Sequence, residues 1–178
     1  MTEPVDQTAF RGALGRFASG VTVVTTVIDG VDHAMTASAF TSVSLEPPQV
    51  LVCSQRSHRF HDAVLESGIW GVSILSERGR AASAWLAQQG RALEGQLDRV
   101  PHRRGALGVS LLDESLAWLE CRTIAVHDGG THSIIVGEVT WAAVNDQDDD
   151  PLLYYRSHYG TIVRSPESEK SLSEGGDA

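Results

Sequence analysis

Hydrophobic and polar positions alternate through much of the first third of the chain, in the pattern of short strands. Residues 21–28 are all Val, Thr or Ile, which predicts a strand, and Asp29 and Gly30 form the preferred pair for a two-residue hairpin turn. A returning strand then enters the small and hydroxyl-rich run 34–45. A Pro-Pro pair follows and predicts the start or edge of the next strand, over residues 49–54.

Three segments have helical spacing instead. Asp6 can cap a first helix, whose apolar positions run up to Gly20. Ser57 can cap a second helix that Gly68 ends, and Ser76 can cap a third. All three predicted helices are short.

The second half of the chain returns to the strand pattern. Further strands are predicted over 69–75, 115–127, 132–145 and from Pro151 to Arg156, with a hairpin at 128–131. Residues 88–106 have no clear periodicity, and a loop of that length is usually functional or mobile. Many short strands with few helices predict a mainly β, closed antiparallel barrel and disfavour a doubly wound sheet.

Composition places the chain among single-domain globular proteins. It has 178 residues, 42% of them hydrophobic and 21% charged. We expect one domain over residues 1–164 and a disordered acidic tail over 165–178. With no visible signal peptide and no apolar run long enough for a membrane helix, the expected location is the cytoplasm, away from membranes. The net charge of −9, without a basic stripe, makes nucleic acid an unexpected partner.

The usual chemical motifs are missing. The chain has no Gly-x-Gly-x-x-Gly, no phosphate-binding Gly-Lys-Ser/Thr loop and no Gly-x-Ser-x-Gly elbow. His58 and His61 could form a metal pair, but no third ligand has suitable spacing, so no metal is expected. Cys53 and Cys121 lie in apolar, strand-like patterns and are expected to be buried free thiols.

Several pieces of the sequence occur in the order found in one known family. They lie at residues 20–26, 34–53, 56–57, 67–75, 116–121, 130–139 and 151–156. Together they span roughly residues 7 to 163, and in this respect the chain resembles the flavin reductase family, the small reductase components of two-component monooxygenases. The resemblance implies a mainly β, antiparallel split β-barrel (the FMN-binding split barrel) with a few short flanking helices, working as a homodimer.

The resemblance also implies a site. Thr36, Ala37, Ser38 and Ala39 match positions that face the isoalloxazine and ribityl of the flavin, and the turn made of Ser54, Gln55, Arg56, Ser57, His58 and Arg59 matches the one that holds the phosphate. The residues themselves agree, because helix-start amides, a hydroxyl and a guanidinium can bind phosphate. His132 matches the histidine on the nicotinamide side, and Tyr155, Arg156 and Tyr159 match a cluster that contacts the dinucleotide.

The expected activity is therefore an NAD(P)H:flavin oxidoreductase that reduces FMN or FAD and supplies a flavin-dependent oxygenase. One alternative is a flavin- or haem-binding barrel that does not turn over NAD(P)H. Another is a structural dimer module in which the Ser/Thr run is only an edge strand. In such a module the arginines of the 54–59 turn are solvated surface charges. The hydrogen bonds of His132 are satisfied at the barrel rim, and the tyrosines serve only as packing residues. The sequence leaves open FMN against FAD and NADH against NADPH.

Overall fold

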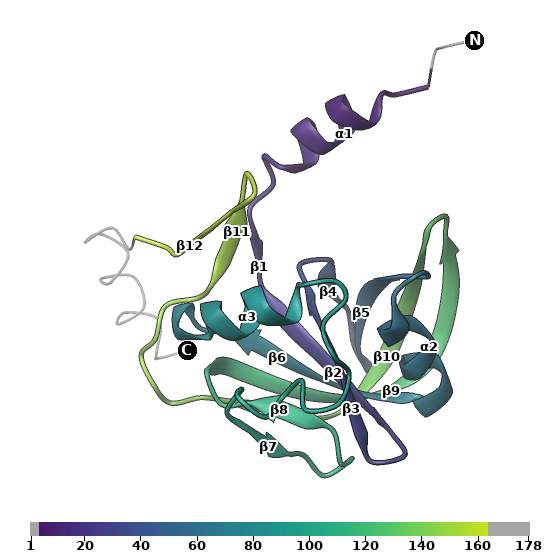
Figure 1. Ribbon diagram of the computed structural model, residues 1–178, viewed down its shortest axis with the longest axis vertical. Coiled ribbons are helices and arrows are strands. Elements are labelled where there is room, and N and C mark those ends of the chain that lie inside the picture. Colours follow the sequence, from purple (N-terminus) through teal and green to yellow (C-terminus); the bar gives the residue numbers. More distant parts are fainter. Residues whose placement is uncertain (1–3, 164–178) are drawn as a thin grey trace.

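The computed structural model describes residues 4–163, and a seven-stranded antiparallel sheet forms its centre (Figure 1). The strand order is β3-β2-β6-β9-β10-β5-β4. The bounds are β2 Thr22–Ile28, β3 Val31–Ala37, β4 Phe40–Leu45, β5 Pro48–Gln55, β6 Ile69–Leu75, β9 Ser115–Gly129 and β10 His132–Val144. The mainly β, antiparallel prediction is confirmed.

The two edges of this sheet are consecutive in the sequence. β3 ends at Ala37 and β4 begins at Phe40, so only Ser38 and Ala39 carry the chain from one edge to the other. The amide of Cys53 in β5 donates to the carbonyl of Ala39 at 3.0 Å and fixes this crossing. The sheet is thereby rolled up, and its hydroxyl-rich run supplies both edge strands.

The hairpin between β2 and β3 follows the sequence prediction. Asp29 and Gly30 have φ angles of 49° and 77°, the left-handed values that a two-residue turn of this kind requires. The side chains inside the roll are tightly packed. Gly137 of β10 shows this, because a Cβ there would lie 2.4 Å from the ring of the fully buried Trp70.

Helices flank the sheet, with different boundaries from those predicted. α1 (Gln7–Leu14) has the expected Asp6 cap, whose side chain accepts from Ala9, but it ends well before Gly20. The chain beyond it is needed for β1 (Ser19–Gly20), which pairs with β11 (Leu153–Tyr155). Figure 1 shows α1 projecting away from the rest of the molecule.

The second and third helices begin later than their predicted caps. α2 (Arg59–Ser67) has His58, not Ser57, at its N-cap, while its end at the left-handed Gly68 is as predicted. Ser76 precedes a 3₁₀ turn, η1 (Glu77–Gly79), and α3 (Arg80–Leu86) follows. The Ser76 hydroxyl donates to the Glu114 carbonyl instead of capping a helix.

Two small sheets complete the fold. β7 (His102–Arg104) pairs with β8 (Ser110–Leu112), so the end of the predicted loop 88–106 is a strand. β12 (His158–Gly160) adds to β11 beyond the predicted last strand. The predicted disordered tail, 165–178, lies outside the described residues. Across residues 4–163, no helix is long and apolar enough to cross a membrane.

Candidate functional site

A cavity of about 610 Å³ lies where the rolled sheet meets α2 and the segment that follows α3. This size is typical of sites for small molecules and cofactors. β3, the 38–39 crossing, β5, the 55–59 turn and the start of β10 all contribute to its wall. Of the predicted flavin-binding residues, it brings together Thr36, Ala37, Ser38, Ala39, Gln55, Ser57, His58 and Arg59.

The wall formed by β3 is an open sheet edge. Arg91 and Gln96 donate side-chain hydrogen bonds to the carbonyls of Ala34 and Asp32 on this edge. The backbone N–H and C=O groups of alternate residues point to the same side of a strand. Those of Thr36 therefore point outward from the sheet edge like those of Asp32 and Ala34, and at Thr36 this edge faces the cavity. The Thr36 hydroxyl itself is already used, because it donates to the Ser83 carbonyl at 2.7 Å.

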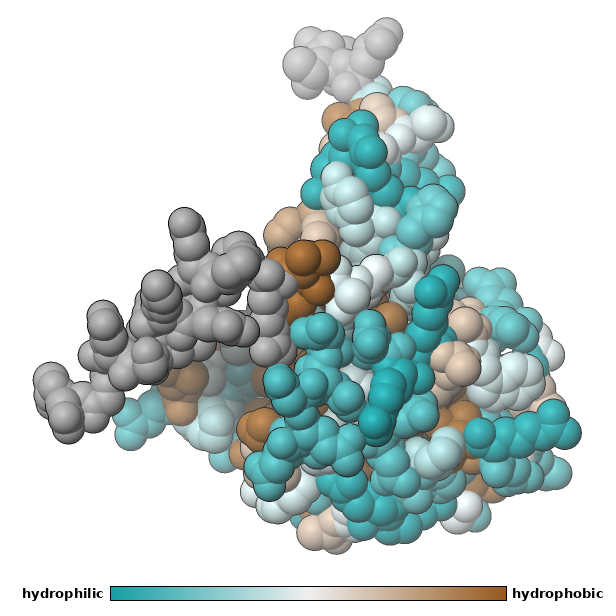
Figure 2. All heavy atoms as spheres, turned by 90° about the vertical axis from the view of Figure 1, so that its left-hand side faces the viewer, coloured by the Kyte–Doolittle hydropathy of each residue, from teal (hydrophilic) through white to brown (hydrophobic). Residues whose placement is uncertain are grey.

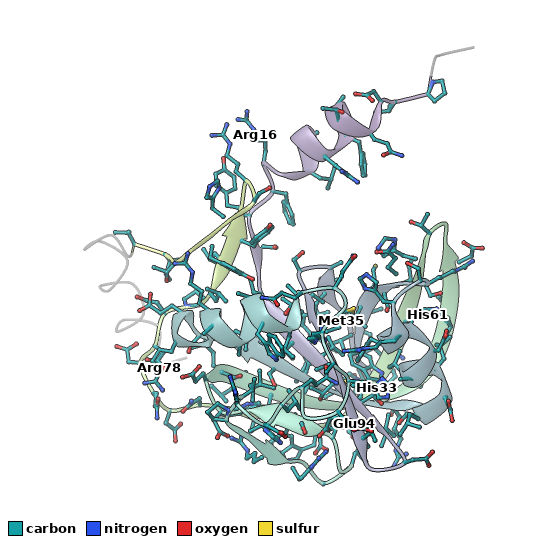
Figure 3. All side chains as sticks on the ribbon, in the orientation of Figure 1. Arg16, His33, Met35, His61, Arg78 and Glu94 are labelled. Atoms are coloured by element: carbon teal, nitrogen blue, oxygen red, sulfur yellow. The ribbon has the colours of Figure 1, made fainter. Side chains whose placement is uncertain are left out.

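The turn after β5 places its residues on two sides. Alternation along β5 directs Cys53 and Gln55 into the cavity, whereas Ser54 is fully buried and lies 3.9 Å from the sulfur of Met35. Met35, labelled in Figure 3, belongs to β3 and itself lines the cavity. Arg56 is not among the lining residues. The structure therefore places Ser54 and Arg56 outside the cavity wall.

Arg56 instead contacts the β9–β10 hairpin. Its guanidinium pairs with Asp128 at 3.2 Å and donates to the Ser133 hydroxyl at 3.4 Å, and its amide donates to the Thr131 carbonyl at 3.0 Å. The Gly130 amide and Arg56 together hold the pKa of Asp128 below its usual value. His61 of α2, labelled in Figure 3, binds the same Ser133 hydroxyl at 2.9 Å.

His132 lies in the chain between Thr131 and Ser133, which both contact Arg56, and it lines the cavity. It is half-buried, and its Nδ1 is 3.0 Å from the Thr131 hydroxyl. An imidazole in this position can donate to or accept from a bound ligand.

The predicted nicotinamide cluster is not at the cavity of this chain. β11 and β12 lie on the other side of α3 from α2 in Figure 1. The Tyr159 hydroxyl bonds Ser83 Oγ at 2.8 Å, and Tyr159 packs against the core. Tyr155 is exposed, and the Arg156 guanidinium lies 5.6 Å from its ring centroid. Within the described residues Tyr159 connects to the cavity through its bond to Ser83, whose carbonyl accepts from Thr36, and through the core cluster that contains the lining residue Leu86.

Sequence reasoning missed one wall of the cavity. Residues 87–96, which we call the strap, follow α3, and Ala87, Gln88, Gln89, Gly90 and Arg91 line the cavity. Aperiodicity and Gly90 were the available signals, and they indicated a functional or mobile loop without naming a residue. The local pattern could not reveal Arg91 because its contacts depend on β3, which is more than fifty residues earlier.

The charge at the cavity contrasts with that of the whole chain. The protein has 23 Asp and Glu against 14 Lys and Arg, yet no described residue of the lining is acidic. Arg59, Arg91, His58 and His132 are its ionisable nitrogen side chains. Such a wall suits an anionic ligand held by local donors.

Both cysteines are free thiols, as predicted, but only one is fully buried. Burial raises the pKa of the Cys121 thiol to about 12, which keeps it protonated. Cys53 is partly exposed and lines the cavity. Within residues 4–163 no group of three metal-ligating side chains comes together.

Comparison with known proteins agrees with this geometry. Residues 14–163 match the family model described as flavin reductase like domain. The chain is 35% identical over 163 residues to the HsaB reductase subunit of a flavin-dependent monooxygenase from Mycobacterium tuberculosis, covering 91% of this chain and 86% of that one. It is 39% identical over 156 residues to the FMN reductase (NADH) SmoA of Agrobacterium fabrum, covering 88% and 86%.

Solved structures give the same result. BorF, the flavin reductase component of a bacterial two-component tryptophan halogenase, superposes with a TM-score of 0.83 at 39% identity, covering 90% of this chain and 100% of BorF. An NADH:FAD oxidoreductase from Streptomyces globisporus, in complex with NAD and FAD fragments, has a TM-score of 0.83 at 30% identity, covering 94% and 99%.

Proposed function

The chain belongs to the flavin reductase-like domain family, and from this premise we propose that it is an NAD(P)H-dependent flavin reductase that supplies free reduced flavin to a partner monooxygenase. The observation that carries the proposal is the cavity itself. It combines an open β edge, small side chains, two arginines and no acidic lining residue among those described. An uncharged ring with a phosphate tail fits this combination.

We propose that the flavin ring lies along Thr36, Ala37, Ser38 and Ala39, with its phosphate end at the start of α2. Small side chains allow a flat ring to approach the backbone, and amides of the open edge can stabilise charge that arises on the ring. Ser57 and Arg59 border the N-terminal end of α2, where unpaired amides favour an anion. Ser54 and Arg56 would support this turn from outside the cavity.

The redox chemistry would be supplied by the flavin, as the acceptor of a hydride from the nicotinamide. The chain needs little acid–base chemistry for this step. Its residues stack and align the two rings and exclude water. We propose that His132 holds the nicotinamide side of the complex by a hydrogen bond from its imidazole.

We further propose that the protein is a cytoplasmic homodimer. α1 has no buried residue, and its Phe10 and Leu14 are more than half exposed, as is Phe17 just beyond it. Phe10 and Leu14 are four residues apart and share one face of α1, and a contiguous exposed apolar patch marks an interaction surface. A partner chain would also bring a second set of Tyr155 and Arg156, which this chain places away from its own cavity.

The proposed location in the cytoplasm agrees with the free thiols of Cys53 and Cys121, because the cytoplasm is a reducing compartment.

The test is oxidation of NADH or NADPH, followed by the loss of dihydronicotinamide absorbance, with FMN, FAD or no flavin added. We expect turnover that requires added flavin, with NADH as donor by analogy with the relatives. Flavin binding without turnover would favour the non-reducing flavin carrier. Neither binding nor turnover would leave only the structural module.

A further inference from the structure

Ser83 of α3 is a fully buried residue whose two oxygens bind separate parts of the fold. Its carbonyl accepts hydrogen bonds from the Thr36 hydroxyl at 2.7 Å and from the Ala87 amide at 3.0 Å. Its side-chain hydroxyl lies 2.8 Å from the hydroxyl of Tyr159 in β12. Thr36 of β3 and Ala87, the first residue of the strap, both line the cavity. One residue therefore joins the tyrosine of β12 to two pieces of the cavity wall.

The Tyr159 side chain is used within the fold at both of its ends. Its ring packs against the core cluster that contains Ala34 and Leu86, which also line the cavity. The ring of Tyr154 meets it edge-on, with the two centroids 5.5 Å apart. Because its hydroxyl is bonded to Ser83, both the ring and the polar tip of Tyr159 are engaged within its own chain.

The position of α3 decides what the Thr36 hydroxyl offers to a ligand. A hydroxyl group donates one hydrogen bond and accepts through two lone pairs. Thr36 donates its proton to the Ser83 carbonyl, so its oxygen can only accept from a bound molecule. A shift of α3 would move that carbonyl and would release the Thr36 proton and the Ala87 amide together.

We propose that Ser83 and Tyr159 are positioning residues for the flavin-binding wall. The bond between their hydroxyl groups tethers α3 to β12, and the Ser83 carbonyl transmits that position to Thr36 and Ala87. Neither residue needs to touch the flavin. The inference deepens the proposed function and rests on it. It gives Tyr159 a role in flavin affinity instead of the dinucleotide contact that the family resemblance implies.

The test compares binding and kinetic constants in Tyr159→Phe, which loses one hydroxyl and keeps the ring. We expect Kd for FMN or FAD, measured by fluorescence quenching, to rise about three- to tenfold, as for the loss of one hydrogen bond. KM for NADH at saturating flavin should stay unchanged. Ser83→Ala removes the other half of the same bond and should raise Kd by a similar factor. Tyr154→Phe, at the neighbouring tyrosine of β11, is the matched control and should alter neither constant.

Combined variants distinguish positioning from a general loss of stability. Tyr159→Phe together with Ser83→Ala should bind flavin no more weakly than either single variant, because both changes break one bond. Thr36→Val removes the donor on the other side of Ser83, and its effect on Kd should be less than additive with that of Tyr159→Phe. Additive effects of Thr36→Val and Tyr159→Phe would contradict the proposal, since they would show that the two residues act independently.

Two further results of Tyr159→Phe would also overturn the proposal. A raised KM for NADH with unchanged flavin affinity would make Tyr159 a dinucleotide contact. Parent values of both constants, with a lower melting temperature, would show that the pair with Ser83 contributes stability alone.

Failure of the proposed function has a different signature, because the unaltered protein would then bind no flavin. Amide hydrogen exchange of the ligand-free protein tests the tether in that case. Faster exchange at Ala87 in Tyr159→Phe than in Tyr154→Phe would support the link from β12 to the cavity wall. Equal exchange in the two variants would overturn it.

Discussion

Single polar side chains around the cavity differ in whether their atoms already have partners. The Thr36 hydroxyl donates to Ser83 and the Arg91 guanidinium donates several hydrogen bonds, whereas the buried Nδ1 of His33 has no hydrogen-bond partner among the described residues. Figure 3 shows His33 on β3, the strand that also carries Met35. Burial, and next the charge of Arg59, lower the pKa of His33, while Asp32 and Glu66 oppose the shift. The fold therefore favours neutral His33.

This residue gives a pH prediction. The unfolded chain binds a proton at the ordinary histidine pKa of about 6.5, and folded His33 binds it only at lower pH. The free energy of unfolding should thus be fully retained above that pH and fall as the pH drops towards the folded-state pKa. Urea unfolding at about pH 7.5 and about pH 5.5 should show a smaller fall for His33→Gln than for the parent protein.

His127→Gln, at an exposed histidine of β9, is the control and should keep the parent's pH dependence. If the free energy of unfolding falls equally between the two pH values for His33→Gln and for the parent protein, His33 has the same pKa in the folded and the unfolded state, and the prediction is wrong.

At the scale of elements, the turn after β5 and the β9–β10 hairpin act as one unit. Arg56 touches Asp128, Thr131 and Ser133, on both sides of His132. Arg56→Ala and Asp128→Asn should therefore both slow hydride transfer at saturating flavin by several-fold, because the hairpin that carries His132 loses the same contact. His132→Ala should slow it at least as much. Single-turnover flavin reduction in a stopped-flow instrument measures these rates.

Flavin affinity separates this role from the one predicted from sequence. A hairpin contact predicts nearly unchanged binding of FMN and riboflavin by both variants. A different result would make Arg56 a phosphate ligand. In that case Arg56→Ala would bind FMN more weakly and riboflavin normally, and Asp128→Asn would bind both flavins with the parent's affinity. Weakening by Arg59→Ala is expected in either case, because Arg59 lines the cavity.

Element prediction succeeded where the signal was local. The strand 69–75 and the Asp29-Gly30 turn have the predicted bounds, because alternation and turn chemistry are written in adjacent residues. Helix starts shifted when a capping hydroxyl found a distant partner, as Ser76 did with Glu114. The β7–β8 pair and the contacts of Arg91 depend on residues far along the chain, which periodicity cannot register. Ser54 was predicted together with Gln55 because the whole 54–59 turn matches the phosphate-holding turn of the family, and that match does not show which face of β5 lines the cavity.

At the scale of the whole molecule, the exposed apolar surface of α1 and the distance of Tyr155 and Arg156 from the cavity both bear on the proposed homodimer. α1 stands clear of the rest of the chain in Figure 2, and the space-filling view shows hydrophobic as well as hydrophilic atoms on that projection. The exposed fractions of Phe10, Leu14 and Phe17 are 58%, 53% and 75%. A second chain that covers this surface would bury it and could bring its β11–β12 hairpin to this cavity.

The last prediction tests that arrangement. If the protein dimerises through α1, Phe10→Ser combined with Leu14→Ser should convert the dimer into a monomer in sedimentation velocity, because the exposed apolar side chains of that surface are removed. Arg11→Ser, on the same helix, should leave the dimer intact. If the partner completes the nicotinamide site, the monomer should keep its flavin affinity but show a KM for NADH raised about tenfold or more. A monomeric parent protein would contradict the homodimer, whereas a monomeric variant with the parent's KM would place the nicotinamide site within one chain.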